Sequence, residues 1–331
     1  SCSSNAGRLL YVVIVAIAYT PIPIWKLGPF ALSLHGLGTG VGFAVGAYLM
    51  VREARARGFD VEKLVSILTW ALVGSMLGAR LFTVPAHITE PGYGFDDVIS
   101  LTGDFSILGG YAGGILVAWW RMRMLEAAVA PHLDMAAAGL AIGAVIGRLG
   151  DIAIVEHLGG PTSFFLGYRL EKGYDVSPQH NFLETLCERS IDPFCGPYHH
   201  TALYDMVGAL VLLGAIFWLR KIWVTRRYGQ LFSFWMIWYG LQRFFIDFTR
   251  LGVARDGLTT PDGTFVEADL MIRDSVMGLL TGSQWGALGA AALGAFLYFR
   301  LRRNPVVSAE NDLEKGALAV PGLTEPEPDQ H

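Results

Sequence analysis

Long apolar runs constrain the fold of this chain more than any other feature. About eight of them recur along its 331 residues, near 9–24, 29–50, 62–84, 107–120, 133–155, 201–219, 229–249 and 276–299. A helix that crosses a bilayer core needs about 20 mostly apolar residues. Only 16% of the residues are charged, against about 25% in a typical soluble domain. The sequence therefore predicts an all-α polytopic membrane protein with about eight transmembrane helices.

Basic residues gather after alternate runs. The clusters are Arg52, Arg55 and Arg57; Arg121 and Arg123; Arg220, Lys221, Arg226 and Arg227; and Arg300, Arg302 and Arg303. The intervening segment 85–106 has no Lys or Arg, and 156–200 has three. Cytoplasmic loops are enriched in Lys and Arg. We therefore expect the basic clusters in the cytoplasm, and both termini there too if the first run spans the membrane.

The runs divide the chain into three parts. Residues 1–27 are predicted to hold an additional N-terminal transmembrane helix, and 28–303 to form the main membrane domain. Within that domain, the Gly- and Pro-containing segments of about 156–200 and 250–275 are predicted to be arms on the outer side, folded as small caps. The polar, acidic stretch 304–331 has the composition of a disordered cytoplasmic tail.

Charge and cysteine content exclude some functions and leave one question open. The net charge of −4 and the lack of a basic arm argue against nucleic-acid binding. The cysteines have no metal-ligand spacing. Cys187 and Cys195 both fall in an outer arm, where a disulfide persists. A disulfide between them and two separate thiols are the alternatives.

Ionisable residues inside the apolar runs are candidates for a functional site. A charge at mid-bilayer costs about 2.5–3.5 kcal/mol on insertion scales, so such residues face the protein interior and mark function. The candidates are Arg80, Arg148, Asp151, Glu156, Asp205, Arg243 and Asp247. The spacing of Arg243 and Asp247, like that of Arg148 and Asp151, puts each pair on one helix face.

These charges allow two interpretations. Two arginines on two helices form a clamp for a phosphate, because guanidinium offers a planar fork of donors. Alternatively, the charges are internal Arg–carboxylate pairs that join helices, and Arg80 extends to a membrane interface. Gly109 and Gly110, at the start of a predicted helix, either allow close helix packing or offer backbone amides to an anion.

Several motifs, in order, resemble those of bacterial prolipoprotein diacylglyceryl transferases. Residues 147–159 resemble the family signature Gly-Arg-x-Gly-Asn-aromatic-x-Asn-x-Glu-x-x-Gly. Further stretches similar to family motifs are Gly28–Leu32 with His35–Leu37, Gly78–Leu81, His199–Asp205 and Tyr239–Arg250, and Gln284 matches a Gln of the last family helix. The resemblance covers roughly residues 28–300.

The resemblance implies transfer of a diacylglyceryl group from phosphatidylglycerol to the lipobox cysteine of a prolipoprotein, with no cofactor. It implies that Arg148 and Arg243 bind the phosphate, and that Glu156 and Asp247 orient these arginines or bind glycerol hydroxyls. The matched positions also imply substrate contacts for His35, Arg80, Gly109, Gly110, Asp151, Gly159 and Tyr239.

The chain departs from the family pattern at several polar positions. Leu108 stands where the family has His, His35 where it has Tyr, and Asp151 where it has Asn. A leucine cannot transfer a proton, so a base contribution of about 10²–10⁴-fold is missing there. Two functions follow: a transferase with a rearranged base, or a catalytically impaired relative that binds phosphatidylglycerol and serves as a structural or assembly subunit, meeting other membrane subunits through its N-terminal helix.

Overall fold

The computed structural model describes residues 17–19, 22, 25–27, 30–84, 94, 106–154, 159, 162–171, 194–250, 258–259, 265–266, 280–308 and 312. Its long helices are α1 (Leu34–Ala56), α2 (Val61–Leu81), α5 (Ile107–Met124), α6 (Val129–Ile154), α8 (Thr201–Ile222), α9 (Gln230–Asp247) and α10 (Gly282–Arg300), followed by a 3₁₀ turn at Leu301–Arg303. The short strands are β1 (Ile17–Tyr19), β2 (Trp25–Leu27), β3 (Phe30–Leu32), β4 (Tyr168–Glu171), β5 (Phe194–Tyr198), β6 (Leu258–Thr259) and β7 (Phe265–Val266).

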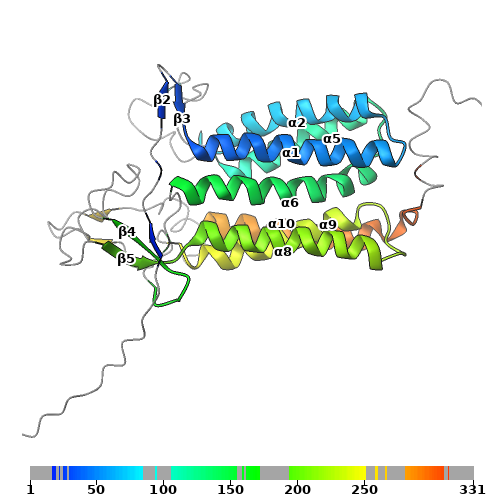
Figure 1. Cartoon of the computed structure of the whole chain (residues 1–331). Helices are drawn as coiled ribbons and strands as arrows, with labels where there is room; N and C mark the ends of the chain where they lie inside the picture. The colour runs from blue at the N-terminus through cyan, green and yellow to red at the C-terminus, as the bar shows by residue number, and fades with distance from the viewer. Residues whose placement is uncertain are drawn as a thin grey trace, which may run out of the picture.

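The helices lie side by side in one bundle, and the strands lie beyond one of its ends (Figure 1). Four helices, α1, α2, α6 and α8, are long and apolar enough to cross a membrane. Exposed apolar side chains cover their outer faces, for example Leu77 on α2 and Val211 on α8. Such a surface suits lipid contact and is unusual on a soluble monomer. The predicted mainly helical, polytopic membrane class is therefore confirmed.

Polar residues fix where several helices begin. Ser33, Ser106 and Thr281 precede α1, α5 and α10, and each side chain accepts a backbone N–H three residues on. At Thr281 the Gln284 side chain also accepts the Thr281 N–H, which completes a capping box. These caps satisfy N–H groups that a helix terminus otherwise leaves without partners.

Glycines set the close packing of α1 against α6. A Cβ added at Gly42 would lie 2.6 Å from the carbonyl oxygen of Gly143, and one at Gly46 would lie 2.6 Å from that of Gly139. A Cβ at Gly150 would collide with the Leu34 carbonyl. The two backbones therefore touch along their length, as small residues allow between membrane helices. This contact holds the first turn of α1 against the last turn of α6.

The helices α2 and α5 pack in the same manner. A Cβ at Gly78 would collide with the Gly109 carbonyl, and one at Gly74 would lie 2.7 Å from the Gly113 carbonyl oxygen. On the other side of the bundle, an apolar core joins α6, α8 and α9. Its fully buried members include Ile216 and Leu231.

The first predicted run does not form a helix where the structure describes it. Ile17–Tyr19 is a strand, paired in parallel with β4 in a sheet of order β1-β4-β5. Pro21 and Pro23 follow at once, and proline removes a donor and clashes inside a helix. A transmembrane helix across 9–24 is therefore wrong for Ile17–Tyr19, while 1–16 lies outside the described residues. Parts of both predicted arms hold strands, β4 and β5 in one and β6 and β7 in the other.

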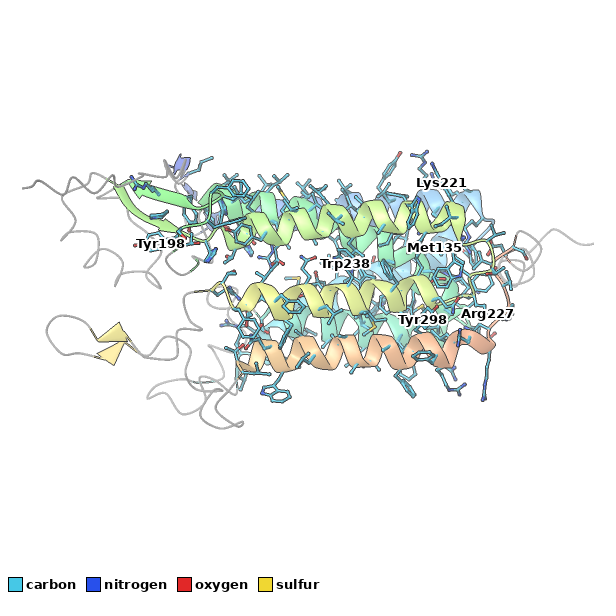
Figure 2. All side chains as sticks on the ribbon, turned by 90° about the horizontal axis from the view of Figure 1, so that it is seen from below. Met135, Tyr198, Lys221, Arg227, Trp238 and Tyr298 are labelled. Atoms are coloured by element: carbon cyan, nitrogen blue, oxygen red, sulfur yellow. The ribbon has the colours of Figure 1, made fainter. Side chains whose placement is uncertain are left out.

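The chain after α10 is ordered further than predicted. Val307 donates its backbone N–H to the Arg226 carbonyl at 2.9 Å, and Arg227 and Val306 form a β-bridge. Asp312 binds the Arg57 guanidinium, with Nη2 to Oδ1 at 2.7 Å. A disordered tail starting at residue 304 is therefore wrong for 304–308 and for Asp312, because backbone pairing and an ion pair hold these residues. The basic clusters lie at this end of the bundle. Figure 2 shows Lys221 and Arg227 at this end and Tyr198 at the other.

Candidate functional site

Asp151, near the end of α6, is the first element of a buried polar network at the end of the bundle nearest the strands. Its side chain is only 2% exposed. One carboxylate oxygen contacts His35 Nδ1 from α1, and the other accepts a hydrogen bond from Arg148, one turn earlier on α6. The three-residue spacing predicted the Arg148 contact, whereas the His35 contact depends on the packing of α1 against α6.

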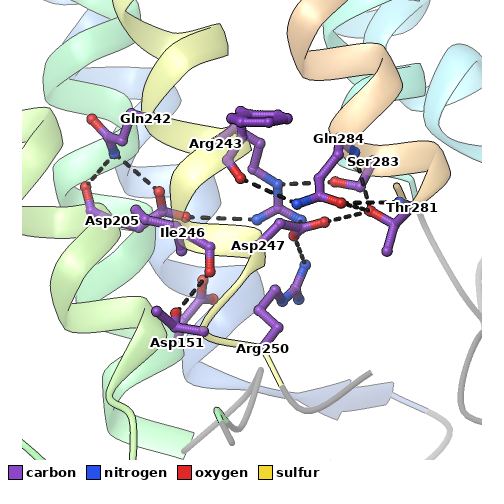
Figure 3. A network of polar contacts seen from close by, with 12 residues as sticks. Asp151, Asp205, Gln242, Arg243, Ile246, Asp247, Arg250, Thr281, Ser283 and Gln284 are labelled. Atoms are coloured by element: carbon purple, nitrogen blue, oxygen red, sulfur yellow. Dashed lines mark hydrogen bonds and ion pairs between the residues drawn. The ribbon is translucent and has the colours of Figure 1, made fainter. Parts of the chain in front are cut away.

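Asp205, in the first turns of α8, links the two halves of the network. Its Oδ2 lies 2.8 Å from Arg148 Nη2 and 3.8 Å from Arg243 Nη1. Gln242, from α9, donates to its Oδ1 at 3.0 Å, as Figure 3 shows. One carboxylate oxygen therefore lies between guanidinium groups from two different helices.

Asp247, at the end of α9, forms the second half. Its Oδ1 lies 3.3 Å from Arg243 Nη2 and 3.5 Å from Arg250 Nη1. Its Oδ2 accepts a hydrogen bond of 2.8 Å from the Thr281 hydroxyl, which caps α10 (Figure 3). Arg243 Nε also donates to the Ser283 hydroxyl at 3.2 Å. The start of α10 thus holds both Arg243 and its carboxylate partner in place.

Aromatic rings lie next to the charges along α9. The Tyr239 ring stacks on Trp235 with centroids 5.4 Å apart and meets Tyr111 of α5 edge-on at 5.1 Å. Tyr239 lies one turn before Arg243 on the same helix. Apolar walls of this kind lower the local dielectric and strengthen the electrostatic interactions of the neighbouring charges.

The network balances three arginines against three aspartates. An isolated buried charge costs several kcal/mol, and close pairing offsets that cost. Burial, together with the nearby charge of Arg243, lowers the pKa of Arg250 to about 10, so it remains a cation at neutral pH. Each guanidinium carries five N–H donors, more than the aspartate and serine contacts require. Guanidinium donors of this kind are chemically suited to an anion such as a phosphate.

Comparison with known proteins decides the family. The profile of a family described as prolipoprotein diacylglyceryl transferase matches residues 22–305. This chain belongs to that family. The match spans α1 to α10 and every residue of the polar network described above.

Several relatives carry the name phosphatidylglycerol–prolipoprotein diacylglyceryl transferase. The protein from Frankia alni is 30% identical over 317 residues, covering 93% of this chain and 73% of the relative. The one from Thermus thermophilus is 29% identical over 228 residues, covering 66% of this chain and 79% of the relative. That from Lysinibacillus sphaericus is 28% identical, covering 86% of this chain and 93% of the relative.

The structure brings together most of the residues that the family motifs pointed to. His35, Arg148, Asp151, Arg243 and Asp247 share one network. Tyr239 packs beside it, and Gly159 joins it through a β-bridge to Arg250. The arrangement has features of both interpretations of the charges. The arginines are paired with aspartates, and they also converge on one position.

The remaining predicted residues have other places. Arg80 lies in the last turn of α2, and Gly109 and Gly110 lie in the first turn of α5, at the same end of the bundle. A Cβ at Gly109 would collide with the Gly78 carbonyl, so this glycine is required for helix packing. Glu156 and Cys187 lie outside the described residues, as does the side chain of Cys195. The two alternatives for Cys187 and Cys195 therefore stay open, and the role of Glu156 stays a prediction.

Some network residues were not predicted as site residues. They are Gln242, Arg250, Thr281 and Ser283. The three-residue spacing of Asp247 and Arg250 is a usable signal for Arg250. Thr281 and Gln284 fit a capping-box pattern. Ser283 carried no comparable signal. Among the described residues no group of His, Cys, Asp and Glu side chains is arranged to hold a metal ion.

Proposed function

We propose that this protein transfers the diacylglyceryl group of phosphatidylglycerol to the lipobox cysteine of a prolipoprotein. In this reaction the cysteine sulfur attacks the glycerol carbon that bears the phosphate, a thioether forms, and glycerol phosphate leaves with the electrons of the broken C–O bond. The thiol must lose a proton and the leaving phosphate must be stabilised by positive charge. The names of the relatives support this substrate pair, and none supports a purely structural subunit.

The convergence of Arg148 and Arg243 on one carboxylate oxygen carries the proposal. Asp205 Oδ2 lies within 2.8 Å of one guanidinium and 3.8 Å of the other. An anionic phosphate oxygen would be held by the same two donors, since guanidinium binds carboxylate and phosphate with similar geometry. In the proposed complex the lipid phosphate takes up donors of both arginines, and the charge that develops on the leaving group stays between them.

The other residues of the network support these two arginines. Asp247, held by Thr281 and Arg250, orients Arg243 from α9. Glu156 is proposed to contact the glycerol headgroup. Arg80, Gly109, Gly110, Gly159 and Tyr239 are proposed to line the path of the lipid at this end of the bundle.

The bundle is proposed to span the bacterial inner membrane several times. The network lies at the end away from the basic clusters, so the positive-inside rule places it toward the outer face. The same rule places the C-terminal end of α10 in the cytoplasm. Ile17–Tyr19 pairs with β4 beyond the opposite end of the bundle. Because residues 1–16 lie outside the described residues, a cytoplasmic N-terminus stays a prediction.

Complementation tests the proposal directly. Cells depleted of their own transferase should recover when they express this protein, and should not recover with Arg148→Gln. Purified protein in phosphatidylglycerol vesicles should add a diacylglyceryl group to a lipobox peptide, detected as a mass increase at cysteine. Arg300→Gln, at the far end of the bundle, is the matched control and should act like wild type. Absence of product from well-folded wild-type protein would contradict the proposed function.

A further inference from the structure

His35 occupies a position from which it can act on a substrate. It lies in the first turn of α1, and its side chain is 36% exposed. Its Nδ1 contacts Asp151 Oδ1 on α6. A carboxylate accepts hydrogen bonds, so in the neutral imidazole this contact places the proton on Nδ1 and the lone pair on Nε2. The same carboxylate-to-imidazole arrangement orients the general base of serine hydrolases.

The imidazole is connected directly to the proposed phosphate site. Asp151 uses its other oxygen to accept from Arg148, whose second terminal nitrogen lies 2.8 Å from Asp205. One guanidinium therefore separates the His35–Asp151 pair from the position proposed for the phosphate. A thiol approaching the neighbouring glycerol carbon would meet the same end of α1 and α6.

Two departures from the family pattern meet in this contact. By the resemblance of the motifs, His35 stands where the family has Tyr and Asp151 where it has Asn, and the two side chains touch across the α1–α6 interface.

We propose that His35 is the general base of this transferase and that Asp151 positions it, an inference that rests on the proposed function. His35 Nε2 accepts the proton of the lipobox thiol, and the thiolate sulfur forms the new S–C bond as the C–O bond to phosphate breaks. The leaving glycerol phosphate takes the electron pair, and the imidazolium passes its proton to that phosphate or to water. Atoms and charge balance without any further reactant.

Among the residues that the structure describes, Asp151 of α6 contacts the His35 imidazole, and Arg148 contacts the other oxygen of Asp151. On α1 itself the next charged residue is Arg52, more than four turns away. Helix α2, which also packs on α1, carries Arg80 in its last turn at this end. The Asp151 carboxylate would stabilise the imidazolium that forms at His35 when the thiol proton is transferred.

The experiment measures transfer to a lipobox peptide across pH 6.5–9.5 in phosphatidylglycerol vesicles. His35→Ala should lower kcat at pH 7 by about 100-fold or more, the usual size of a general-base contribution. His35→Gln should do the same while keeping a hydrogen-bonding group opposite Asp151. The deficit of both variants should shrink as pH rises past about 8.5, where a thiol ionises without help. Lipid retention and thermal stability should match wild type.

Asp151→Asn separates positioning from binding. As a single variant it should lower kcat about tenfold or more, and in a His35→Gln background its further effect on kcat should be smaller, because the two residues act as a unit and only the contact of Asp151 with Arg148 is then changed. His132→Gln is the control: it makes the same histidine-to-glutamine change as His35→Gln, but at the end of α6 opposite Asp151, and it should leave transfer unchanged. Either of two results would overturn the inference: His35→Gln active within threefold of wild type at pH 7, or a deficit that is constant with pH. Inactive wild-type protein would instead refute the proposed function.

Discussion

Both ends of the helix bundle bury aspartates, but they bind them in different ways. At the basic end, Asp134 of α6 is 4% exposed and accepts three backbone N–H groups around the start of α9, from Gly229, Leu231 and Phe232 at 2.8–3.0 Å. At the other end, Asp205 and Asp247 are bound mainly by arginine, glutamine and threonine side chains. A buried carboxylate in an apolar run therefore has two quite different roles in one molecule.

The type of donor explains the difference. The residue before α9, Gly229, has φ of 91° and no side chain to cap the helix, so Asp134 caps it from outside. Backbone N–H groups at a helix start are fixed in direction, and a carboxylate that they saturate is a structural element. Guanidinium groups move on flexible stems and carry spare donors. Side-chain donors of this second kind are suited to a substrate anion, whereas the backbone N–H groups around Asp134 are not.

The largest expected effect concerns the end of the bundle that holds the network of Arg148 and Arg243. Arg243→Gln should lower kcat about 10³-fold, because it removes one of two cations that stabilise the leaving phosphate; loss of a single such donor costs about 2.7–4 kcal/mol. Arg243→Lys should also be impaired, since lysine lacks the planar fork. Peptide-transfer assays give the rates, and thermal unfolding in detergent checks the fold. Activity near wild type in Arg243→Gln would remove the functional contrast between the ends.

The second-largest expected effect concerns Asp134 at the basic end. Asp134→Ala should lower the free energy of unfolding by about 3 kcal/mol, because it leaves three buried N–H groups without their charged acceptor. Asp60→Ala is the matched comparison: Asp60 caps α2 by accepting the N–H groups of Glu62 and Lys63, and an ordinary cap contributes about 1 kcal/mol. Thermal unfolding in detergent measures both. Equal losses would show that Asp134 is an ordinary cap.

A smaller effect is expected at the C-terminal segment of the same end. Asp312 binds Arg57 through both oxygens and accepts the Tyr228 hydroxyl at 2.6 Å. Burial and the Asp312 carboxylate raise the pKa of Tyr228 to about 12. Asp312→Asn should cost about 1 kcal/mol, lower the pKa of Tyr228 and speed amide exchange at 306–308. Transfer activity should not change, and a change would mean that the two ends are coupled.

The smallest expected effect concerns His200 and is not seen at neutral pH. His200 caps α8 by accepting the Leu203 N–H, and burial lowers its pKa to about 4. The unfolded chain protonates a histidine near pH 6.5, so the unfolded state binds more protons between these values. The stabilising contribution is complete above pH 6.5 and is lost as pH falls toward 4. His200→Asn should show a shallower fall of Tm over this window than wild type, and identical slopes would contradict the assignment.

The local features of this protein could be predicted from its sequence. Hydropathy placed α1 to α10, because a helix in lipid needs a continuous apolar run. The three- and four-residue spacings predicted the contacts of Arg148 with Asp151 and of Arg243 with Asp247. The hydropathy-based prediction of a helix failed at Ile17–Tyr19, where the two following prolines and the pairing with β4 outweigh the apolar content.

What only the tertiary structure decided are the contacts between helices far apart in the chain. Nothing in the spacing shows that Asp205 of α8 would lie between arginines of α6 and α9, or that His35 would reach Asp151. These meetings depend on how closely helices approach, which the glycines of α1 and α6 permit, and on where each helix begins, which its cap fixes. The sequence by itself determined which charges are buried, whereas the packing determined which charge meets which, because partner choice in a bundle is a property of helix crossing and not of any single helix.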